Sequence, residues 1–273
     1  MKLHNRTVIV FCALVVLDIA AWGTIFAARP GVPAIYFLDV GQGDSELVVF
    51  PGNVKILTDA GPDQKIVRSL ENAIPGERYI DLAVVSHVQK DHFGGFNDVL
   101  KHYRVGAFIV NGRADAEAES EWNALLREIE RQNIPLIVLG VGDAVRVGAA
   151  RVDILSPDED WIQSGEPNDT GLVEKITLPS LTALFTADTG FEIEKHLLGR
   201  GVDLRADILK VGHHGSKYSS SEEFLTAVRP AVAAIGVGKN TYGHPARETL
   251  ARLARFAKNV FRTDSDGTVK IEA

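Results

Sequence analysis

Short apolar runs recur along the chain at the spacing of strands separated by turns and helices. They lie at residues 35–38, 47–50, 54–57, 82–85, 107–110, 136–139, 150–155, 171–178, 182–186 and 268–271. Helical patterns lie at 66–73, 96–103 and 117–132, and helix and strand alternate again from 192 to 260. Strands in series, interspersed helices and two similar halves predict an α/β domain in which two sheets pack face to face with helices outside.

The longest apolar run lies at the N-terminus. Residues 7–28 carry one formal charge, Asp18, and follow Lys2 and Arg6. A run of this length can cross a bilayer, and its apolar residues outweigh the cost of about 3 kcal/mol for Asp18. Because Lys2 and Arg6 favour the cytoplasmic side, we predict residues 1–29 as a single-pass membrane anchor and residues 30–273 as an extracytoplasmic domain. A cleaved signal peptide is the alternative, although no small-x-small site precedes Arg29.

The charge of the chain limits how it can bind a polyanion. The formal net charge is −7, and without the first 30 residues 26 Lys and Arg stand against 35 Asp and Glu. A domain this acidic does not attract nucleic acid by bulk charge, so such a substrate would need metal ions and a local basic patch. The single cysteine, Cys12, excludes an intramolecular disulfide and a cysteine-based metal site.

A group of metal-binding residue types follows the predicted strand at 82–85. His87, Asp91 and His92 lie within six positions, where a loop at the sheet edge can turn them toward one ion or two. A helix N-cap with solvated polar neighbours is the alternative interpretation. Gln89 lies among them, and its neutral amide oxygen is a weaker ligand for zinc or manganese than imidazole or carboxylate.

Other predicted strands also end in loops that carry Asp or His. Asp44 lies in a segment with two glycines, which suits either a ligand loop or a generic turn. Asp59 is suited to hold the histidine loop. Asp188 follows the strand at 182–186, where a carboxylate can bridge two metal ions or cap a helix.

The most specific string is His-His-Gly-Ser-Lys-Tyr-Ser-Ser at residues 213–220. It offers metal ligation, proton transfer and anion binding together. Ser220 with Glu223 predicts a capping box, which would aim the next helix's free N–H groups at an anion. A further loop at residues 240–245 contains Asn240, Tyr242 and His244.

In this order, these strings resemble the hydrolase domain of the ComEC-like group in the metallo-β-lactamase superfamily. The resemblance covers about residues 34–272 and omits the group's multispanning channel. It implies a four-layer αββα sandwich, one or two divalent ions of manganese or zinc, and hydrolysis of phosphodiesters in DNA. Gln89 stands where the superfamily has histidine or aspartate, and Asn168 stands where many members have a histidine ligand.

The resemblance also implies roles for single residues. The metal positions are His87, Asp91, His92 and Asp188, and either the His213–His214 pair or His244 supplies the last ligand. We assign that ligand to His214 and leave His213, His244 and Lys217 as catalytic side chains. Substrate contacts are predicted for Asp44, Ser216, Asn240 and Tyr242. Supporting positions around the ligands are predicted for Asp59, Gln89 and Asn168.

Two functions follow as hypotheses. The first is a membrane-anchored, extracytoplasmic hydrolase of phosphoester bonds in nucleic acid, with DNA as the expected substrate. The second is a non-catalytic metal-binding module that binds nucleic acid or an envelope partner, and Gln89 favours it. A true β-lactamase is a third interpretation, which the His-His-Gly-Ser loop and the predicted anchor disfavour. The sequence predicts no particular protein partner.

Overall fold

The computed structural model describes residues 14, 15, 17, 18, 32–113 and 120–273. Residues Met1–Val32 and Pro33–Ala273 form separate units. The predicted anchor at residues 7–28 falls almost wholly outside the described residues, as does the start of the helix predicted at 117–132. Within the described part of the chain, no helix has the length and apolar character needed to cross a bilayer.

Two seven-stranded sheets form the body of the larger unit. The first has the spatial order β14 (Val269–Glu272), β1 (Ala34–Phe37), β2 (Glu46–Val49), β3 (Lys55–Thr58), β4 (Tyr79–Val85), β5 (Arg104–Val110) and β6 (Leu136–Val138). The second has the order β13 (Asn259–Arg262), β12 (Val232–Ile235), β11 (Ile208–Lys210), β10 (Thr182–Phe185), β9 (Val173–Thr177), β8 (Ala150–Ser156) and β7 (Ala144–Val147).

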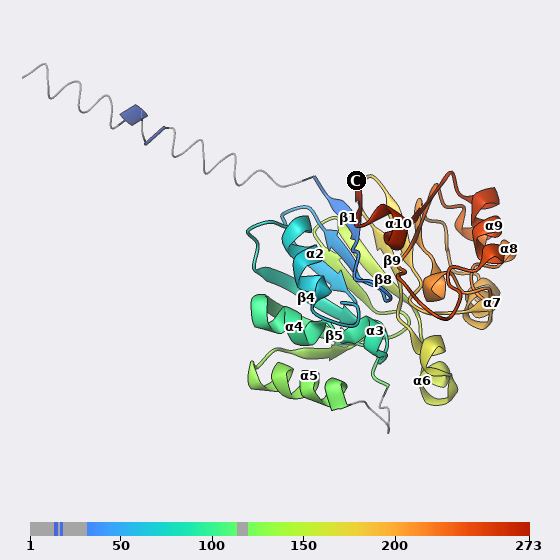
Figure 1. Ribbon diagram of the computed structural model, residues 1–273, viewed down its shortest axis with the longest axis horizontal. Helices are drawn as coiled ribbons and strands as arrows, with labels where there is room; N and C mark the ends of the chain where they lie inside the picture. The colour runs from blue at the N-terminus through green and yellow to red at the C-terminus, as the bar shows by residue number, and fades with distance from the viewer. Residues whose placement is uncertain (1–13, 16, 19–31, 114–119) are drawn as a thin grey trace, which may run out of the picture. The chain divides into compact units, whose positions relative to one another are not determined.

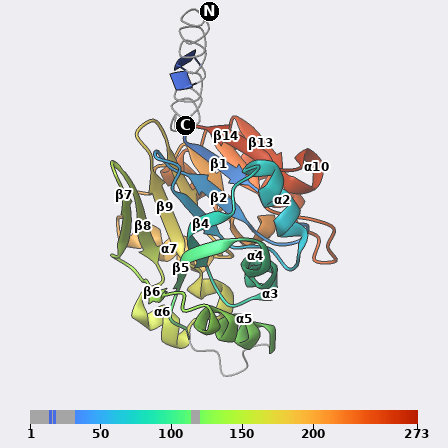
Figure 2. The ribbon, with the colours of Figure 1, turned by 90° about the vertical axis from the view of Figure 1, so that its left-hand side faces the viewer.

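Helices cover the outer face of each sheet (Figure 1). On one side lie α2 (Lys65–Ala73), α4 (Phe96–His102) and α5 (Ser120–Arg131), and on the other α7 (Phe191–Gly199), α8 (Glu222–Val228) and α9 (Arg247–Phe256). Figure 2 turns the first helical face toward the viewer. Shorter elements are α3 (Lys90–Phe93), α6 (Glu159–Ser164), α10 (Thr263–Asp266), η1 (Pro167–Thr170) and η2 (Gly212–Gly215). The predicted two-sheet α/β sandwich is therefore confirmed.

Three apolar clusters hold these layers together. Phe37, Phe185 and Ile208 pack between the sheets, whereas residues such as Leu70 and Phe224 pack under the outer helices. Successive strand residues point to opposite faces, so a strand covered on both sides reads as a continuous apolar run. This is why the central strands were visible in the sequence as unbroken runs.

The parallel strands place the polar loops at one edge. β3, β4, β5 and β6 are parallel, and so are β10, β11, β12 and β13. Carboxyl ends of parallel strands meet at the same edge of a sheet, where α/β proteins bind ligands. The loops after β3, β4, β10, β11 and β12 carry most of the predicted site residues, whereas Asp44 follows β1 and Asn168 lies in η1.

A buried glutamate between the sheets makes stability depend on pH. Thr58 donates a hydrogen bond of 2.9 Å from Oγ1 to Oε2 of Glu174, and burial raises the pKa of Glu174 to about 8. The contribution of Glu174 to stability is therefore fully present below its unfolded pKa of about 4.5 and is lost as the pH rises to about 8. We expect Glu174→Gln to match the wild type near pH 4 and to be more stable than the wild type by up to about 5 kcal/mol at pH 9, as measured by urea unfolding. A pH-independent difference would contradict this.

Candidate metal centre

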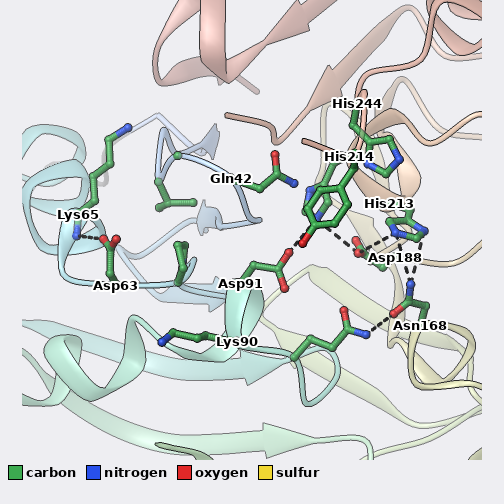
Figure 3. Close-up of a pocket in the computed structure, with 15 residues that line it drawn as sticks. Gln42, Asp63, Lys65, Lys90, Asp91, Asn168, Asp188, His213, His214 and His244 are labelled. Atoms are coloured by element: carbon green, nitrogen blue, oxygen red, sulfur yellow. Dashed lines mark hydrogen bonds and ion pairs between the residues drawn. The ribbon is translucent and has the colours of Figure 1, made fainter. Parts of the chain in front are cut away.

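A cavity opens at the edge where the strand-end loops converge (Figure 3). It has a volume of about 630 Å³ and is lined by loops from both sheets. The predicted residues that line it are Gln89, Asp91, Asn168, Asp188, His213, His214, Tyr242 and His244. The fold thus brings residues from five separate segments of the chain together around one cavity.

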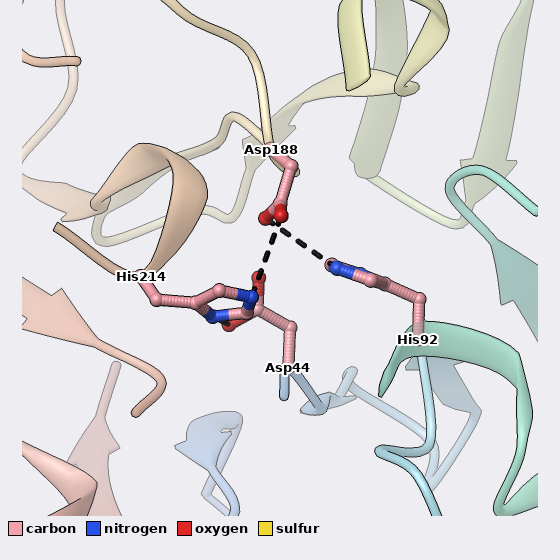
Figure 4. A group of neighbouring side chains, drawn as sticks. All are labelled: Asp44, His92, Asp188 and His214. Carbon is pink, nitrogen blue, oxygen red and sulfur yellow. Dashed lines mark ion pairs between the residues drawn. The ribbon is translucent and has the colours of Figure 1, made fainter. Parts of the chain in front are cut away.

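Four side chains meet around one point on the floor of this cavity. Nε2 of His92 lies 3.4 Å from Oδ1 of Asp188, and Nε2 of His214 lies 3.4 Å from Oδ2 of Asp188 (Figure 4). Nε2 of His214 also lies 3.3 Å from Oδ2 of Asp91. Two imidazoles and two carboxylates at these distances form a ligand set suited to zinc or manganese.

Both imidazoles are fixed by their other ring nitrogen. Nδ1 of His92 donates to Oδ2 of Asp59 over 2.7 Å, and Nδ1 of His214 donates to the Gly236 carbonyl over 2.8 Å. Asp59 also accepts from the backbone N–H and the hydroxyl of Ser86 at 2.9 and 2.6 Å. Partners of this kind fix the tautomer and orientation of metal-binding histidines, and they leave Nε2 directed at the centre.

The centre contains buried polar atoms without hydrogen bonds. Among the described residues these atoms include Nε2 of His87, His92 and His214 and Oδ1 of Asp188. Buried polar groups normally have a partner, and a cation supplies one to every atom in such a cluster. Burial lowers the pKa of His92 and His214, but the charge of Asp188, together with Asp59 beside His92 and Asp44 beside His214, outweighs it and raises both pKa values well above their usual range. Metal binding at this centre would therefore release protons.

Asp44 lies behind the centre, which differs from its predicted contact with substrate. It is fully buried, its Oδ2 pairs with Nζ of Lys210, and its Oδ1 lies 3.3 Å from Nδ1 of His214. Ligand atoms of Asp44, His92, Asp188 and His214 all lie within 4.8 Å of one another. However, Asp44 approaches His214 at the ring nitrogen that faces away from Asp91, so we assign it to orienting that ring.

Lys210 is a buried cation that the sequence analysis missed. Its Nζ pairs with Asp44, donates to the Ala187 carbonyl over 2.7 Å and lies 3.9 Å from Oδ1 of Asp188. Burial opposes the charged forms of both partners, but their mutual attraction, together with Asp188 near Lys210 and His214 near Asp44, outweighs it. The pKa of Lys210 is raised and that of Asp44 is lowered. This ion pair connects the loop between β1 and β2 of the first sheet to β11 of the second sheet, beneath the centre.

His87 and Asp91 flank the centre. The His87 ring is buried 4.1 Å from the His92 ring, and burial together with His92 lowers its pKa to about 4. The Asp91 side chain is 31% exposed. Burial would raise the pKa of Asp91, but the approach of Nε2 of His214 to 3.3 Å and the charge of His92 hold it at about 2. A neutral imidazole and an ionised carboxylate are the forms that bind metal.

Gln89 and Asn168 form a hydrogen-bonded pair, which we call the amide bridge. Nε2 of Gln89 donates to Oδ1 of Asn168 over 2.5 Å, and Nδ2 of Asn168 lies 3.4 Å from Nε2 of His213. The two positions where the superfamily often has metal ligands thus bind each other. Any ion near His87 would have fewer strong ligands than one between His92, Asp188 and His214.

His213 and His244 line the cavity wall beside the centre. Nε2 of His213 lies 3.9 Å from Oδ2 of Asp188, and the rings of His213 and His244 are 5.3 Å apart. Residues 213 and 214 both have positive φ, 48° and 50°, a strained region for residues other than glycine. That turn directs adjacent histidines differently, one to the floor and one to the wall.

Three further predictions differ from the structure. Lys217 does not line the metal cavity. Ser216 is buried, and its Oγ accepts from the backbone N–H of Tyr218 at 3.3 Å. The amide of Asn240 is used within its own loop, where Oδ1 accepts from the N–H groups of Tyr242 and His244 at 3.1 Å and Nδ2 donates to the carbonyls of Gly238 and His244. Asn240 therefore shapes the loop instead of reaching a substrate.

The predicted capping box is also corrected. Helix α8 begins after Ser221, whose hydroxyl accepts from the N–H of Phe224, so the N-cap is one residue later than Ser220. The carboxylate of Glu194 accepts from the N–H groups of Ser220 and Ser221. An internal anion therefore already occupies the position at which a substrate phosphate was expected.

Comparison with known proteins identifies the class. The pattern of the metallo-β-lactamase superfamily matches residues 38–239, and the chain belongs to that superfamily. It is 28% identical over 253 residues to ComE operon protein 3 of Bacillus subtilis (strain 168) and 30% identical over 253 residues to Competence protein ComA of Neisseria gonorrhoeae. These matches cover 85% and 87% of this chain and 32% of each relative, so the chain spans about a third of their length.

A solved structure supports the fold. The metallo-β-lactamase fold protein YhfI from Bacillus subtilis superimposes with a TM-score of 0.59 at 12% identity, covering 88% of this chain and 100% of that protein. The resemblance to ComEC-type proteins predicted from the loop sequences is confirmed by the competence relatives. The chain thus combines the fold of a superfamily of metal-dependent hydrolases with a potential metal centre of Asp and His side chains.

Proposed function

We propose that this protein is a metal-dependent phosphodiesterase that acts on nucleic acid. The observation that carries the proposal is the group of unpartnered buried atoms on His92, His214 and Asp188 at the floor of a solvent-open cavity. A divalent ion such as manganese or zinc fits this ligand set. The chemistry supplied by such an ion is polarisation of a phosphoryl oxygen and activation of water.

The side chains of this chain would divide the remaining work. Asp188 contacts both Nε2 atoms and so fixes the spacing of His92 and His214. His213 and His244 stand at the wall, where one of them can give a proton to the leaving oxygen. Asp59, Asp44 and the Gly236 carbonyl hold the two imidazoles in place from behind.

Nucleic acid is the proposed substrate because of the relatives. One of them is named a competence protein and another a ComE operon protein, and these names support a role on DNA. The direct test is cleavage of DNA, RNA and a small phosphodiester by the purified full chain, with manganese, with zinc and with a chelator. Metal-dependent cleavage of DNA supports the proposal, and no cleavage of any phosphodiester by metal-loaded protein overturns it.

The amide bridge favours a second candidate, the non-catalytic binding module. Gln89 and Asn168 use their amides on each other, so one ion is expected to bind tightly. We predict that Gln89→Asp raises bound manganese from about one toward two ions per chain and raises phosphodiesterase activity with it, because a carboxylate suits a hard ion. Gln89→Asn is the control for metal content and cleavage rate, because asparagine has the length of aspartate without its charge. If Gln89→Asp binds a second ion but neither it nor the wild type cleaves a phosphodiester, the binding module is favoured.

We also propose that residues 1–29 anchor the chain in a membrane and that the hydrolase domain lies outside the cytoplasm. Lys2, Arg6 and the apolar run from residue 7 to 28 support this topology. Protease added to spheroplasts is expected to digest the domain while a cytoplasmic marker stays intact. A domain that survives until the cells are lysed would contradict the proposal.

A further inference from the structure

A second cavity adjoins the metal centre and shares part of its wall. It has a volume of about 620 Å³ and is lined by Lys217, Tyr218, Tyr242 and Arg247, together with His213 and His244; we call it the aromatic pocket. Tyr242, His213 and His244 also line the metal cavity, so the two cavities adjoin along these three side chains. A strand with a phosphate at the centre would have the aromatic pocket beside it.

Two large aromatic rings are exposed in this pocket. Tyr218 is 62% exposed and Tyr242 is 74% exposed. Their loops are nevertheless held by hydrogen bonds: Asn240 accepts from the N–H of Tyr242, and the N–H of Phe191 donates to the Tyr218 carbonyl over 2.8 Å. The guanidinium of Arg252 donates to the carbonyls on either side of Tyr218, at Lys217 and Ser219. The rings are therefore exposed on a backbone that is already held in place. This favours binding, because little conformational entropy is lost when a ligand binds.

Positive charge accompanies the rings. Nζ of Lys217 lies 4.8 Å from the centre of the Tyr218 ring, and Arg247 lines the same pocket. Among the described residues, neither Lys217 nor Arg247 forms an ion pair with a carboxylate. Glu248 is the one carboxylate in the lining. In a domain with excess acidic residues, two cations beside two aromatic rings form the local basic patch that an anionic chain requires.

We propose that the aromatic pocket binds unpaired bases of a nucleic-acid strand on one side of the phosphate at the metal centre. Exposed aromatic rings stack on bases of any sequence, and nearby Lys and Arg hold the backbone phosphates. In a duplex the base faces are covered by their neighbours, so this subsite selects single-stranded nucleic acid. The inference rests on the proposed function and names the form of its substrate.

The test measures binding without turnover. A dye-labelled oligothymidylate is titrated with the full chain in a chelator, and fluorescence anisotropy gives the affinity. We expect Tyr218→Ala and Tyr242→Ala each to weaken binding about 5- to 100-fold, and Tyr218→Phe to bind like the wild type because stacking needs only the ring. Replacing Lys217 and Arg247 by glutamine should flatten the salt dependence of binding.

The matched control is Tyr79→Ala. Tyr79 is 40% exposed with the guanidinium of Arg104 5.8 Å from its ring, but it begins β4 and so lies at the sheet edge opposite the metal centre. Binding by Tyr218→Ala and Tyr242→Ala as tight as by Tyr79→Ala would overturn the inference. Three other results would overturn it as well. The wild type could bind a duplex as tightly as the single strand, it could bind no oligonucleotide, or the tyrosine variants could lose binding only to anionic vesicles. A chain that binds as expected yet cleaves nothing would overturn the proposed function and leave the pocket assigned.

Discussion

Asp188→Ala is expected to abolish tight metal binding and, with it, phosphodiester cleavage. Asp188 lies 3.4 Å from Nε2 of both His92 and His214, whereas Asp91, which also lies near both rings, is 4.0 Å from Nε2 of His92. Loss of a residue that merely supports a ligand weakens metal binding about 10- to 100-fold, so loss of this carboxylate should cost more than about 100-fold. Metal content after dialysis and the cleavage rate at saturating manganese measure the two effects.

His87→Ala and Asp158→Ala are the comparisons for this variant. His87 lies beside His92, but the bond between Gln89 and Asn168 leaves an ion near His87 with fewer strong ligands, so His87→Ala should lose less metal than Asp188→Ala. Asp158 also pairs with a histidine, His196 at 3.0 Å, but caps α6 away from the cavity and should keep all its metal. Equal metal loss for Asp188→Ala and His87→Ala would remove the central role assigned to Asp188.

Lys210→Met is expected to destabilise the fold by about 3–5 kcal/mol. It removes a buried cation and leaves Asp44 fully buried without its partner. Breaking one half of a buried ion pair costs this much because the remaining charge is neither solvated nor paired. Urea unfolding at pH 7 measures the change in unfolding free energy.

Two variants separate this effect from a general loss of charge. Lys270→Met breaks an exposed pair with Glu272 and should cost less than about 1 kcal/mol. Lys210→Met combined with Asp44→Leu removes both buried charges and should recover most of the lost stability. If the double variant is as unstable as the single one, the destabilisation does not come from an unpaired Asp44.

The sequence predicted the fold and the general position of the site for a simple physical reason. Strands covered on both faces are continuously apolar, and polar residues that follow parallel strands must meet at one sheet edge. Asp59, His92, Asp188 and His214 follow strands in this way and lie together in the structure. The direction in which each side chain points depends on tertiary contacts, which no local sequence pattern contains.

The differences illustrate that limit. Asp44 sits in a glycine-containing loop that suits substrate contact, but its partner Lys210 is 166 residues away in a strand that reads as apolar. Ser220 and Glu223 fit a capping box, yet Glu194 of α7 takes the N–H groups at that helix start. Asn240 matches a substrate-binding position, but its amide is fully used by neighbouring backbone. In each case the direction of the side chain was set by a residue distant in sequence or by the loop's own backbone.

The central claim is that one metal ion between His92, Asp188 and His214 makes the protein a nucleic-acid phosphodiesterase. The most direct measurement titrates manganese into the chelator-treated full chain while counting bound ions per chain and the rate of DNA cleavage in the same samples. We predict no cleavage without metal and a rate that rises in proportion to the first bound ion. Cleavage that persists in chelator, or a fully occupied centre that cleaves no phosphodiester, would contradict the account.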